Sequence, residues 1–325
     1  MAFNKILIIQ TAFLGDVILA TPLIESISRE FPSAKIDFLL KKGNEALLQG
    51  HPKLHNVYVF DKSTKRRSMI NLLRSIRKEK YDLVLNLHRF ASSGLLTIFS
   101  GAKETRGFSK NPLSLFYTKK FKHVIGEGAH EVDRNLTLLS DLLKNPIRRP
   151  QLYPSVEDFA FVSKWKGLPY YCLAPASVWF TKQAPPAIWQ YVMEKYDEEG
   201  IQFYLLGGPA DFDLCEGIKQ MSQRSNVHNL AGQLSLMQSA ALMKDAKRNF
   251  VNDSGPLHIA SAGNAPVSAF FCSTTPAFGF GPLSEDSSVI EVQNLACRPC
   301  GLHGHQACPK GHFQCGTGLV EAMNR

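Results

Sequence analysis

Short apolar runs alternate with amphipathic stretches along most of the chain. In the first half, four apolar runs predict buried strands: Lys5–Ile9, Ile36–Leu40, Val57–Phe60 and Leu83–Leu87. Stretches with helical periodicity predict three helices: Gly15–Phe31, Lys62–Lys80 and Glu131–Leu143. Strands that alternate with helices are typical of a parallel α/β sheet.

The same alternation restarts after residues 145–154, which contain three prolines and are the best linker candidate. Strands are predicted at Tyr171–Ala174, Gln202–Leu206, near Val227, at Asn249–Val251 and at Pro266–Phe271. Helices are predicted at Pro186–Glu199, Asp213–Gln223, Ser235–Lys244 and Gly255–Gly263. We therefore expect two doubly wound domains, residues 1–150 and 151–325, with ligands in a cleft beyond the carboxyl ends of the strands.

The composition supports this assignment. Of the 325 residues, 44% are apolar and 20% are charged, which is typical of a globular chain and excludes a disordered, collagen-like or small disulfide-rich protein. No apolar run approaches the roughly 20 residues that a spanning helix needs. The apolar run Ile6–Ile9 is too short for a signal peptide. We expect a cytoplasmic protein.

The charge is divided unevenly between the two halves. Residues 1–150 contain 25 Lys and Arg against 13 Asp and Glu, a net charge of +12, whereas the remainder has a net charge of −3. Such a basic half indicates a polyanionic partner, either nucleic acid, anionic lipid or a phosphorylated glycan, or else a solvated surface. The stretch Lys62–Lys80 has eight Lys and Arg and is either a solvated helix or one that contacts a membrane.

The loop after the first predicted strand contains Gly15 and Asp16. It lacks the glycine fingerprint of dinucleotide-binding domains and the Gly-Lys-Ser/Thr of a P-loop. Asp16 falls where the next helix begins, so its carboxylate either caps that helix or acts as a general base in the cleft.

Three loops of the second half carry groups that suit a phosphate. Ser254 and Gly255 begin a predicted helix whose N–H groups can bind an anion, with Asp253 before them and His258 one turn later. Simple helix capping and a half-buried histidine are the alternatives. A second loop offers the hydroxyls of Ser177 and Thr181 and the mobile charge of Lys182. The third, Gly207–Asp211, either lets a backbone approach a ligand or is an ordinary tight turn.

Taken in order, these loops resemble the ADP-heptose:lipopolysaccharide heptosyltransferases, glycosyltransferase family 9. The resemblance covers residues 4–315 and rests on these segments: Gly15-Asp16, Ala20-Thr-Pro22, the Lys182 loop, Gly207-Gly208-Pro209, Asn229-Leu-Ala-Gly232 and Asp253-Ser-Gly-Pro-Leu-His258. Thr105-Arg-Gly-Phe108 and His130-Glu-Val-Asp-Arg134 are similar to landmarks of the acceptor-side domain. The resemblance implies the GT-B fold, two Rossmann-like domains that face each other across a cleft.

The resemblance also implies a function: inverting, metal-independent transfer of a heptose from ADP-heptose to the inner core of lipopolysaccharide, on an acceptor of the Kdo–lipid A type. Residues 1–150 would bind the acceptor, with Arg106 among its contacts and Asp16 as the base. Residues 151–325 would bind the donor through these residues: Ser177, Thr181, Lys182, Asp211, Asp253, Ser254, Gly255 and His258. The implied partners are an ADP-sugar, an anionic glycolipid and, peripherally, the cytoplasmic surface of the inner membrane.

Three departures from the family pattern leave the substrates open. Gln183-Ala-Pro185 replaces a more usual basic residue, Trp and Pro, and Cys272 stands where glycine is usual. The loop Phe90–Gly94 matches no pattern. One alternative is therefore a glycosyltransferase that uses another nucleotide sugar for a surface glycan. A dinucleotide-dependent oxidoreductase would require the missing glycine fingerprint. A nucleic-acid-binding protein is not expected either, because no recognised motif is present and the basic half lacks the clustered cysteines.

Those cysteines form a tail with the spacing Cys297-x2-Cys300-x7-Cys308-x6-Cys315. Thiols grouped in this way in a reducing compartment are more often metal ligands than disulfides, so a structural zinc or an iron–sulfur cluster is one interpretation. A metal-free cluster is the other. If the tail (297–315) binds a metal, we expect that metal to be structural and remote from the chemistry. We expect no cofactor to be required for catalysis.

Overall fold

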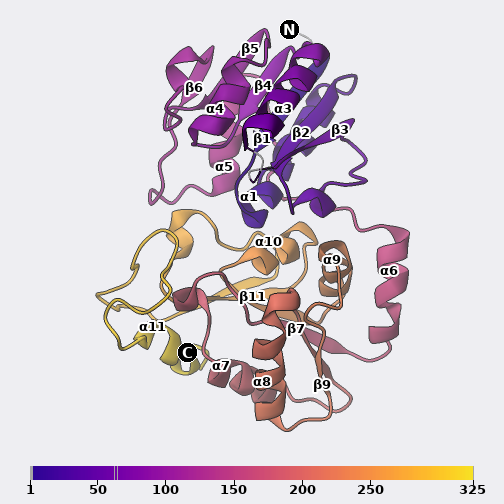
Figure 1. Cartoon of the computed structure of the whole chain (residues 1–325). Helices are drawn as coiled ribbons and strands as arrows, with labels where there is room; N and C mark the ends of the chain where they lie inside the picture. Colours follow the sequence, from indigo (N-terminus) through magenta and orange to yellow (C-terminus); the bar gives the residue numbers. More distant parts are fainter. Residues whose placement is uncertain (1–2, 62, 64, 325) are drawn as a thin grey trace. The chain divides into compact units, whose positions relative to one another are not determined.

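The computed structural model describes residues 3–61, 63 and 65–324 of the chain. The chain divides into two compact units (Figure 1). The first contains Met1–Ile125 and Glu131–Tyr153, and the second contains Gly126–His130 and Pro154–Arg325. Each unit has its own six-stranded sheet, and the predicted pair of doubly wound domains is confirmed.

The first unit is built on a parallel sheet with the strand order β3-β2-β1-β4-β5-β6. Its strands are β1 (Lys5–Gln10), β2 (Lys35–Lys41), β3 (Asn56–Phe60), β4 (Leu83–Asn86), β5 (Glu104–Phe108) and β6 (Lys119–Phe121). Ile8 lies in register with Phe38 on β2 and Leu85 on β4, and all three side chains are fully buried. A strand that is apolar on both faces can form only where helices cover both faces of the sheet.

The helices of the first unit are α1 (Leu14–Ile18), α2 (Thr21–Glu30), α3 (Lys65–Glu79), α4 (Ala91–Ile98) and α5 (Glu131–Leu136). The single helix predicted over Gly15–Phe31 was wrong, because the chain breaks between α1 and α2. Pro22 has no N–H to continue the helical bonding pattern, and the Thr21 hydroxyl donates a 2.7 Å hydrogen bond to the Ile18 carbonyl instead. Lys62 and Thr64 of the predicted basic helix lie outside the described residues.

The second unit repeats the same topology, with the strand order β12-β11-β10-β7-β8-β9. Its strands are β7 (Tyr170–Ala174), β8 (Gln202–Leu205), β9 (Val227–Asn229), β10 (Arg248–Asn252), β11 (Val267–Phe271) and β12 (Ser287–Glu291). Its helices are α6 (Val156–Val162), α7 (Pro186–Lys195), α8 (Phe212–Ser222), α9 (Leu236–Lys244), α10 (Gly255–Ala262), α11 (Gln314–Thr317) and α12 (Leu319–Ala322). Trp189, Phe203, Phe250 and Phe270 fill the core beside the sheet.

In each sheet, the strand order brings together the loops that follow the two central strands, β1 and β4 in the first unit and β7 and β10 in the second. The chain reverses its direction of travel across the sheet between β1 and β4 in the first unit, and between β7 and β10 in the second. In open α/β sheets, ligands bind at this switch point, beyond the carboxyl ends of the strands. The loop that contains Asp16 follows β1, and the loops that contain Lys182 and Asp253 follow β7 and β10.

The predicted linker is held along helix α2 rather than being free. The N–H of Ile147 donates to the Ser26 hydroxyl at 2.8 Å, and the N–H of Gln151 donates to the Thr21 hydroxyl at 2.9 Å. The Tyr153 hydroxyl donates to buried Glu25 at 2.9 Å. The segment up to Tyr153 therefore belongs to the first unit.

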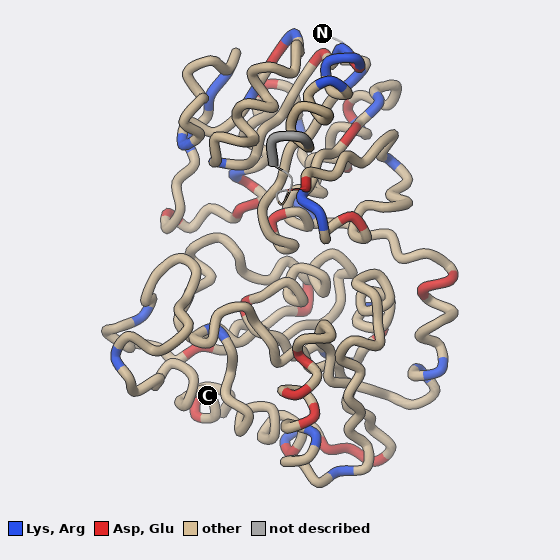
Figure 2. The backbone as a smooth tube through the Cα atoms, viewed as in Figure 1, with Lys and Arg blue, Asp and Glu red and all other residues tan. Residues whose placement is uncertain are grey.

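Basic residues recur throughout the first unit (Figure 2), in agreement with its net charge of +12 over residues 1–150. Within the part of the chain that the structure describes, none of the helices combines the length and the apolar character required to cross a bilayer.

Candidate functional site

Asp16 lies at the start of the first unit's helix α1, directly beyond strand β1. Its Oδ2 atom accepts a 3.1 Å hydrogen bond from the Phe13 N–H, so the carboxylate does cap the helix. The side chain is half-buried. Beside this loop, the Thr11 hydroxyl and His88 Nδ1 lie 3.0 Å apart and connect the ends of β1 and β4. The carboxylate is thus held in one orientation at the switch point of the first sheet.

The surroundings of Asp16 raise its pKa to about 6. Burial is the main cause, and the negative charge of Glu131 adds to it, while Arg89 acts in the opposite direction. Glu131 itself is buried, and His123 and Arg134 keep its pKa below the ordinary value by hydrogen bonding despite that burial. Glu131 therefore stays negative. Its influence on Asp16 was not predicted, since the two residues are more than a hundred positions apart in the sequence.

Two exposed aromatic rings with cations above them lie on the loops at this edge of the sheet. Lys41 Nζ is 5.1 Å from the centre of the Phe13 ring, and Arg89 Cζ is 5.6 Å from the centre of the Phe90 ring. Phe13 and Phe90 are 59% and 55% exposed, which is unusual for large apolar side chains. Exposed aromatic rings with adjacent positive charges suit a ligand that has both sugar faces and anionic groups.

In the second unit, the structure brings Lys182 and Asp253 together. Lys182 Nζ lies 2.7 Å from Asp253 Oδ2, and the two side chains are only 15% and 8% exposed. Lys182 ends a short 3-10 turn (Phe180–Lys182) in the loop after β7, and Asp253 directly follows β10. Neighbouring strands thus deliver a cation and an anion to one point at this sheet edge.

Two further buried side chains support the pair and its loop, and their role could not be predicted from the sequence. The Thr274 hydroxyl donates a 2.6 Å hydrogen bond to Asp253 Oδ2. Asn252 donates to the Pro175 carbonyl at 2.7 Å and accepts from the Ala184 N–H at 2.9 Å, so it ties the end of β10 to both ends of the Lys182 loop. The Lys182 loop comprises residues 175–184, between β7 and α7.

Four other candidate residues lie on these loops: Ser177, Thr181, Ser254 and Gly255. Ser254 is the N-cap residue of α10 without a side-chain cap, and Gly255 begins that helix. Ser177 is half-buried, and its carbonyl accepts a 2.6 Å hydrogen bond from Gln183, the residue that departs from the family pattern. Thr181 is buried, and its hydroxyl accepts from the Ser273 hydroxyl at 3.0 Å and from the His305 N–H at 2.8 Å. The Thr181 hydroxyl is thus already hydrogen-bonded within the protein.

His258 lies on α10, one turn after Gly255, and is buried. Burial lowers its pKa to about 3, with Asp253 acting against that shift and His130 and Lys182 reinforcing it. The imidazole is therefore neutral at physiological pH. Among the described residues, its Nδ1 atom has no hydrogen-bond partner. A neutral ring can exchange a hydrogen bond with a ligand but adds no positive charge.

Asp211 lies apart from this group, in the turn after β8. Its Oδ2 atom accepts a 2.8 Å hydrogen bond from the Gly208 N–H, and a Cβ on Gly207 would lie 2.7 Å from the Asp211 Cβ. The turn therefore requires glycine at position 207. Asp211-Phe212-Asp213 has the Asp-x-Asp spacing of some metal sites. However, within the described ranges no group of three or more His, Cys, Asp or Glu side chains is arranged to hold a metal ion.

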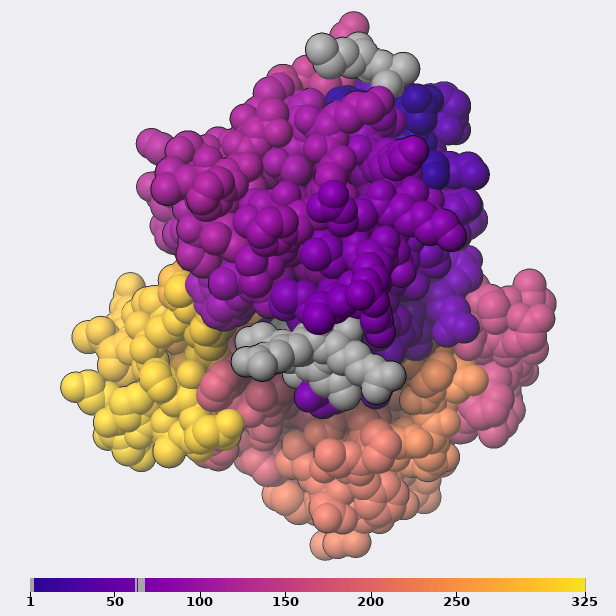
Figure 3. All heavy atoms as spheres, turned by 45° about the horizontal axis from the view of Figure 1, so that its top comes forward, coloured from indigo at the N-terminus to yellow at the C-terminus, as the bar shows by residue number. Residues whose placement is uncertain are grey.

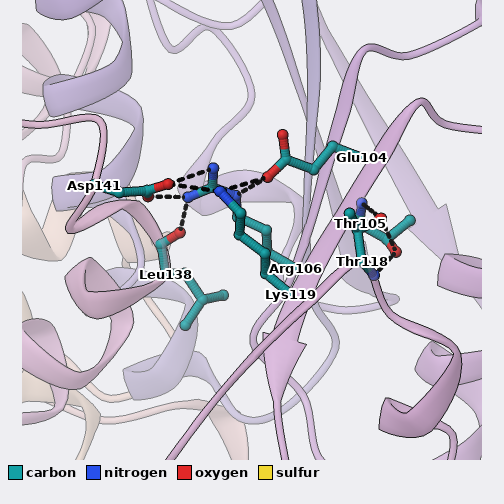
Figure 4. A network of polar contacts seen from close by, with 7 residues as sticks. All are labelled: Glu104, Thr105, Arg106, Thr118, Lys119, Leu138 and Asp141. Carbon is teal, nitrogen blue, oxygen red and sulfur yellow. Dashed lines mark hydrogen bonds and ion pairs between the residues drawn. The ribbon is translucent and has the colours of Figure 1, made fainter.

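Arg106, the predicted acceptor contact, lies on β5 and is 1% exposed. Its guanidinium donates to Glu104 at 2.7 Å, to the Leu138 carbonyl at 2.8 Å and to Asp141 (Figure 4). Lys119 also contacts Asp141, at 2.7 Å. The donors of Arg106 are directed into the first unit. This geometry favours a structural role for Arg106 over the predicted contact with the acceptor.

The cysteine-rich tail (residues 297–315) has four free thiols, those of Cys297, Cys300, Cys308 and Cys315. Burial raises the pKa of Cys315 to about 11, whereas backbone N–H groups of residues 310–313 lower the pKa of Cys308 despite the opposing effect of burial. The side chains of the described residues do not form a metal-holding group here. The tail also reaches the candidate site, because the His305 backbone contacts Thr181, the neighbour of Lys182.

The candidate residues thus form two groups, one in each unit. Asp16 lies in the first unit with Glu131 and Arg89 around it. Lys182, Asp253, Ser254, Gly255 and His258 gather at the β7–β10 edge of the second unit.

Comparisons with known proteins identify the family of the chain. Residues 69–308 match the family described as glycosyltransferase family 9 (heptosyltransferase). The chain is 28% identical over 285 residues to lipopolysaccharide heptosyltransferase 3 of Escherichia coli, covering 82% of this chain and 83% of the relative. It is 25% identical over 312 residues to lipopolysaccharide heptosyltransferase 1 of Pseudomonas aeruginosa, covering 91% and 86% of the two chains.

Solved structures establish the fold. The chain is similar to E. coli ADP-heptose lipopolysaccharide heptosyltransferase II, with a TM-score of 0.78, 23% identity and coverage of 99% and 100% of the two chains. A glycosyltransferase family 9 protein from Veillonella parvula gives a TM-score of 0.80 at 20% identity, with coverage of 100% and 98%. The predicted GT-B fold class is confirmed.

Replacing Arg106 tests its structural role. Arg106→Met should lower the free energy of unfolding by about 3 kcal/mol, because it leaves Glu104 and the Leu138 carbonyl without their buried partner. Lys119→Met, in the same network but 45% exposed, should cost less than about 1 kcal/mol. Urea denaturation measures both variants. Equal stability of Arg106→Met and the natural protein would contradict the role.

Proposed function

The chain belongs to glycosyltransferase family 9, and we propose that it transfers a heptose from ADP-heptose to the inner core of lipopolysaccharide. The observation that carries the proposal is the Lys182–Asp253 pair at the switch point of the second sheet, beside the start of helix α10. An ammonium and a helix N-terminus at one place suit a diphosphate. The names of the relatives supply the identity of the sugar and of the acceptor.

The second unit is proposed to hold the donor. Lys182 and the N–H groups of Ser254 and Gly255 would stabilise the negative charge that develops on the departing diphosphate. Asp253 holds the ammonium in place before the donor binds and would then accept hydrogen bonds from sugar hydroxyls. The turn at Gly207 and Gly208, with Asp211 as its cap, lies at the end of β8, where the nucleoside would extend.

The first unit is proposed to hold the acceptor. Asp16 would remove the proton of the acceptor hydroxyl as the oxygen attacks the anomeric carbon, and displacement from the opposite face inverts that centre. A carboxyl with a pKa of about 6 is largely ionised at pH 7 and still basic enough to take the proton. Because the acceptor is a lipid, we also propose that this unit works at the surface of the membrane.

Asp16→Asn should lower kcat about 1000-fold, the usual contribution of a general base. In the natural protein, kcat/KM should be constant above about pH 7 and fall ten-fold per pH unit below about pH 6, since only the ionised carboxylate accepts a proton. Asp158→Asn is the matched control, because Asp158 makes the same type of helix cap with the Ser155 N–H at 2.9 Å. Full activity of Asp16→Asn would refute the base assignment.

Lys41 and Arg89 are proposed to attract the anionic acceptor in place of Arg106. Lys41→Gln and Arg89→Gln should each raise the acceptor KM about five-fold, and added salt should remove the difference by screening. Lys103→Gln removes the same charge from the opposite edge of the sheet, before β5, and should leave the acceptor KM unchanged. Equal effects of all three variants would indicate a response to net charge alone.

The charge on the leaving diphosphate is proposed to be balanced by Lys182 and helix α10 without a metal ion. Transfer should therefore proceed at the same rate in EDTA as in magnesium, as measured by the release of ADP. A rate that falls in EDTA and recovers with magnesium would contradict this. Elemental analysis of the purified protein tests separately whether the tail carries zinc or iron.

A further inference from the structure

The tail contacts the Lys182 loop through two hydrogen bonds between Thr181 and His305. The Thr181 N–H donates to the His305 carbonyl at 3.0 Å, and the His305 N–H donates to the Thr181 hydroxyl at 2.8 Å. The rings of Phe180 and Phe313 pack with their centres 5.1 Å apart. The two segments are more than a hundred residues apart in the sequence. The tail forms part of the surface of the second unit (Figure 3, yellow).

Gly304 permits the close approach of the tail to Lys182. Its φ is +76°, in the left-handed region, and a Cβ at this position would lie 2.9 Å from Lys182 Cγ and 3.1 Å from both Thr181 Oγ1 and Trp179 Cβ. Thr181 Oγ1 and Trp179 Cβ cannot move away as the end of a flexible side chain can, because Thr181 is buried and a Cβ atom is attached directly to the backbone. The stem of Lys182 therefore rests directly on the backbone of the tail.

The other end of the tail supports Asp253 through Thr274. Arg298 donates 2.6 Å hydrogen bonds to the carbonyls of Cys272 and Thr274, and it pairs with Glu291. Thr274 in turn donates to Asp253. The Cys300 N–H donates to the Ser273 carbonyl at 2.9 Å, and the Ser273 hydroxyl donates to Thr181. One segment thus contacts the supports of both members of the ion pair.

We infer that the cysteine-rich tail positions the Lys182–Asp253 pair, with Gly304 and Arg298 as its positioning residues. The Lys182 loop has only a three-residue 3-10 turn of its own, so much of its order comes from these outside contacts. Displacing the tail would move the ammonium away from the diphosphate without removing any group that touches it. The inference rests on the proposed function only in assigning the diphosphate to this pair.

Gly304→Ala tests the inference, and Gly311→Ala is its matched control. Gly311 lies in the same tail with a φ of +75°, but a Cβ there meets nothing within 4 Å. Both variants therefore introduce the same backbone strain, and only Gly304→Ala pushes on Lys182. Calorimetry with ADP should show about ten-fold weaker binding for Gly304→Ala, the loss expected when a charged hydrogen bond is displaced, and less than a three-fold change for Gly311→Ala.

A double-mutant cycle separates positioning from general damage. Gly304→Ala should weaken ADP binding no further in a Lys182→Ala background, because its effect passes through that side chain. Hydrogen exchange, which needs no ligand, should show a faster-exchanging Thr181 amide in Gly304→Ala than in Gly311→Ala. Similar melting temperatures of the two variants establish that both are folded.

Two results would overturn the inference: equal ADP affinity and Thr181 exchange in the two glycine variants, or full additivity of Gly304→Ala with Lys182→Ala. Failure of the natural protein to bind ADP while it binds GDP or UDP would instead refute the proposed donor. The exchange measurement would still decide the role of the tail.

Discussion

A largely buried ammonium paired with a buried carboxylate constrains the loops at the carboxyl ends of the central strands in the second unit. Removing both charges from water is unfavourable, and their attraction compensates only when the geometry is good and the remaining polar atoms are satisfied. Here the Lys182–Asp253 contact of 2.7 Å is supported by the Thr274 hydroxyl, and Asn252 ties the strand end to the loop. If a diphosphate binds here as proposed, it meets a cation already desolvated and oriented, so little reorganisation remains for the reaction itself.

In the first unit, the net charge and the charge next to the candidate base differ in sign. It is strongly basic as a whole, yet the one carboxylate assigned to the chemistry is next to another carboxylate, Glu131, which His123 and Arg134 keep ionised. In the proposed function, the general positive charge would attract the anionic acceptor over a distance, whereas the local negative charge makes Asp16 a stronger base. Long-range and short-range electrostatics can therefore differ in sign without conflict, because salt screens the distant charges far more than the buried neighbour.

Features that depend on local sequence pattern could be predicted. Apolar runs located most of the strands, and Asp16, Lys182 and Asp253 were expected, as candidate site residues, in the loops where they lie, after β1, β7 and β10. The edge strand β12 was missed because its residues are mostly exposed and carry no apolar run. Arg106 lies in a segment similar to a family landmark and was expected to contact the acceptor, but its guanidinium is buried and pairs with Asp141, which is 35 positions away. The contact between Gly304 and Lys182 could not be predicted at all, since it joins two loops with no periodicity.

The division of the chain into units has a topological consequence. Gly126–His130 belongs to the second unit although its flanking residues belong to the first, and His130 Nε2 lies 3.1 Å from the Gly281 carbonyl. The backbone therefore passes between the units three times, and only the last passage lies at the boundary after Tyr153. A chimaera joined at that boundary to the first half of a relative would inherit the relative's version of this five-residue strap. Exchanging second units between family members thus requires that the strap be exchanged with them.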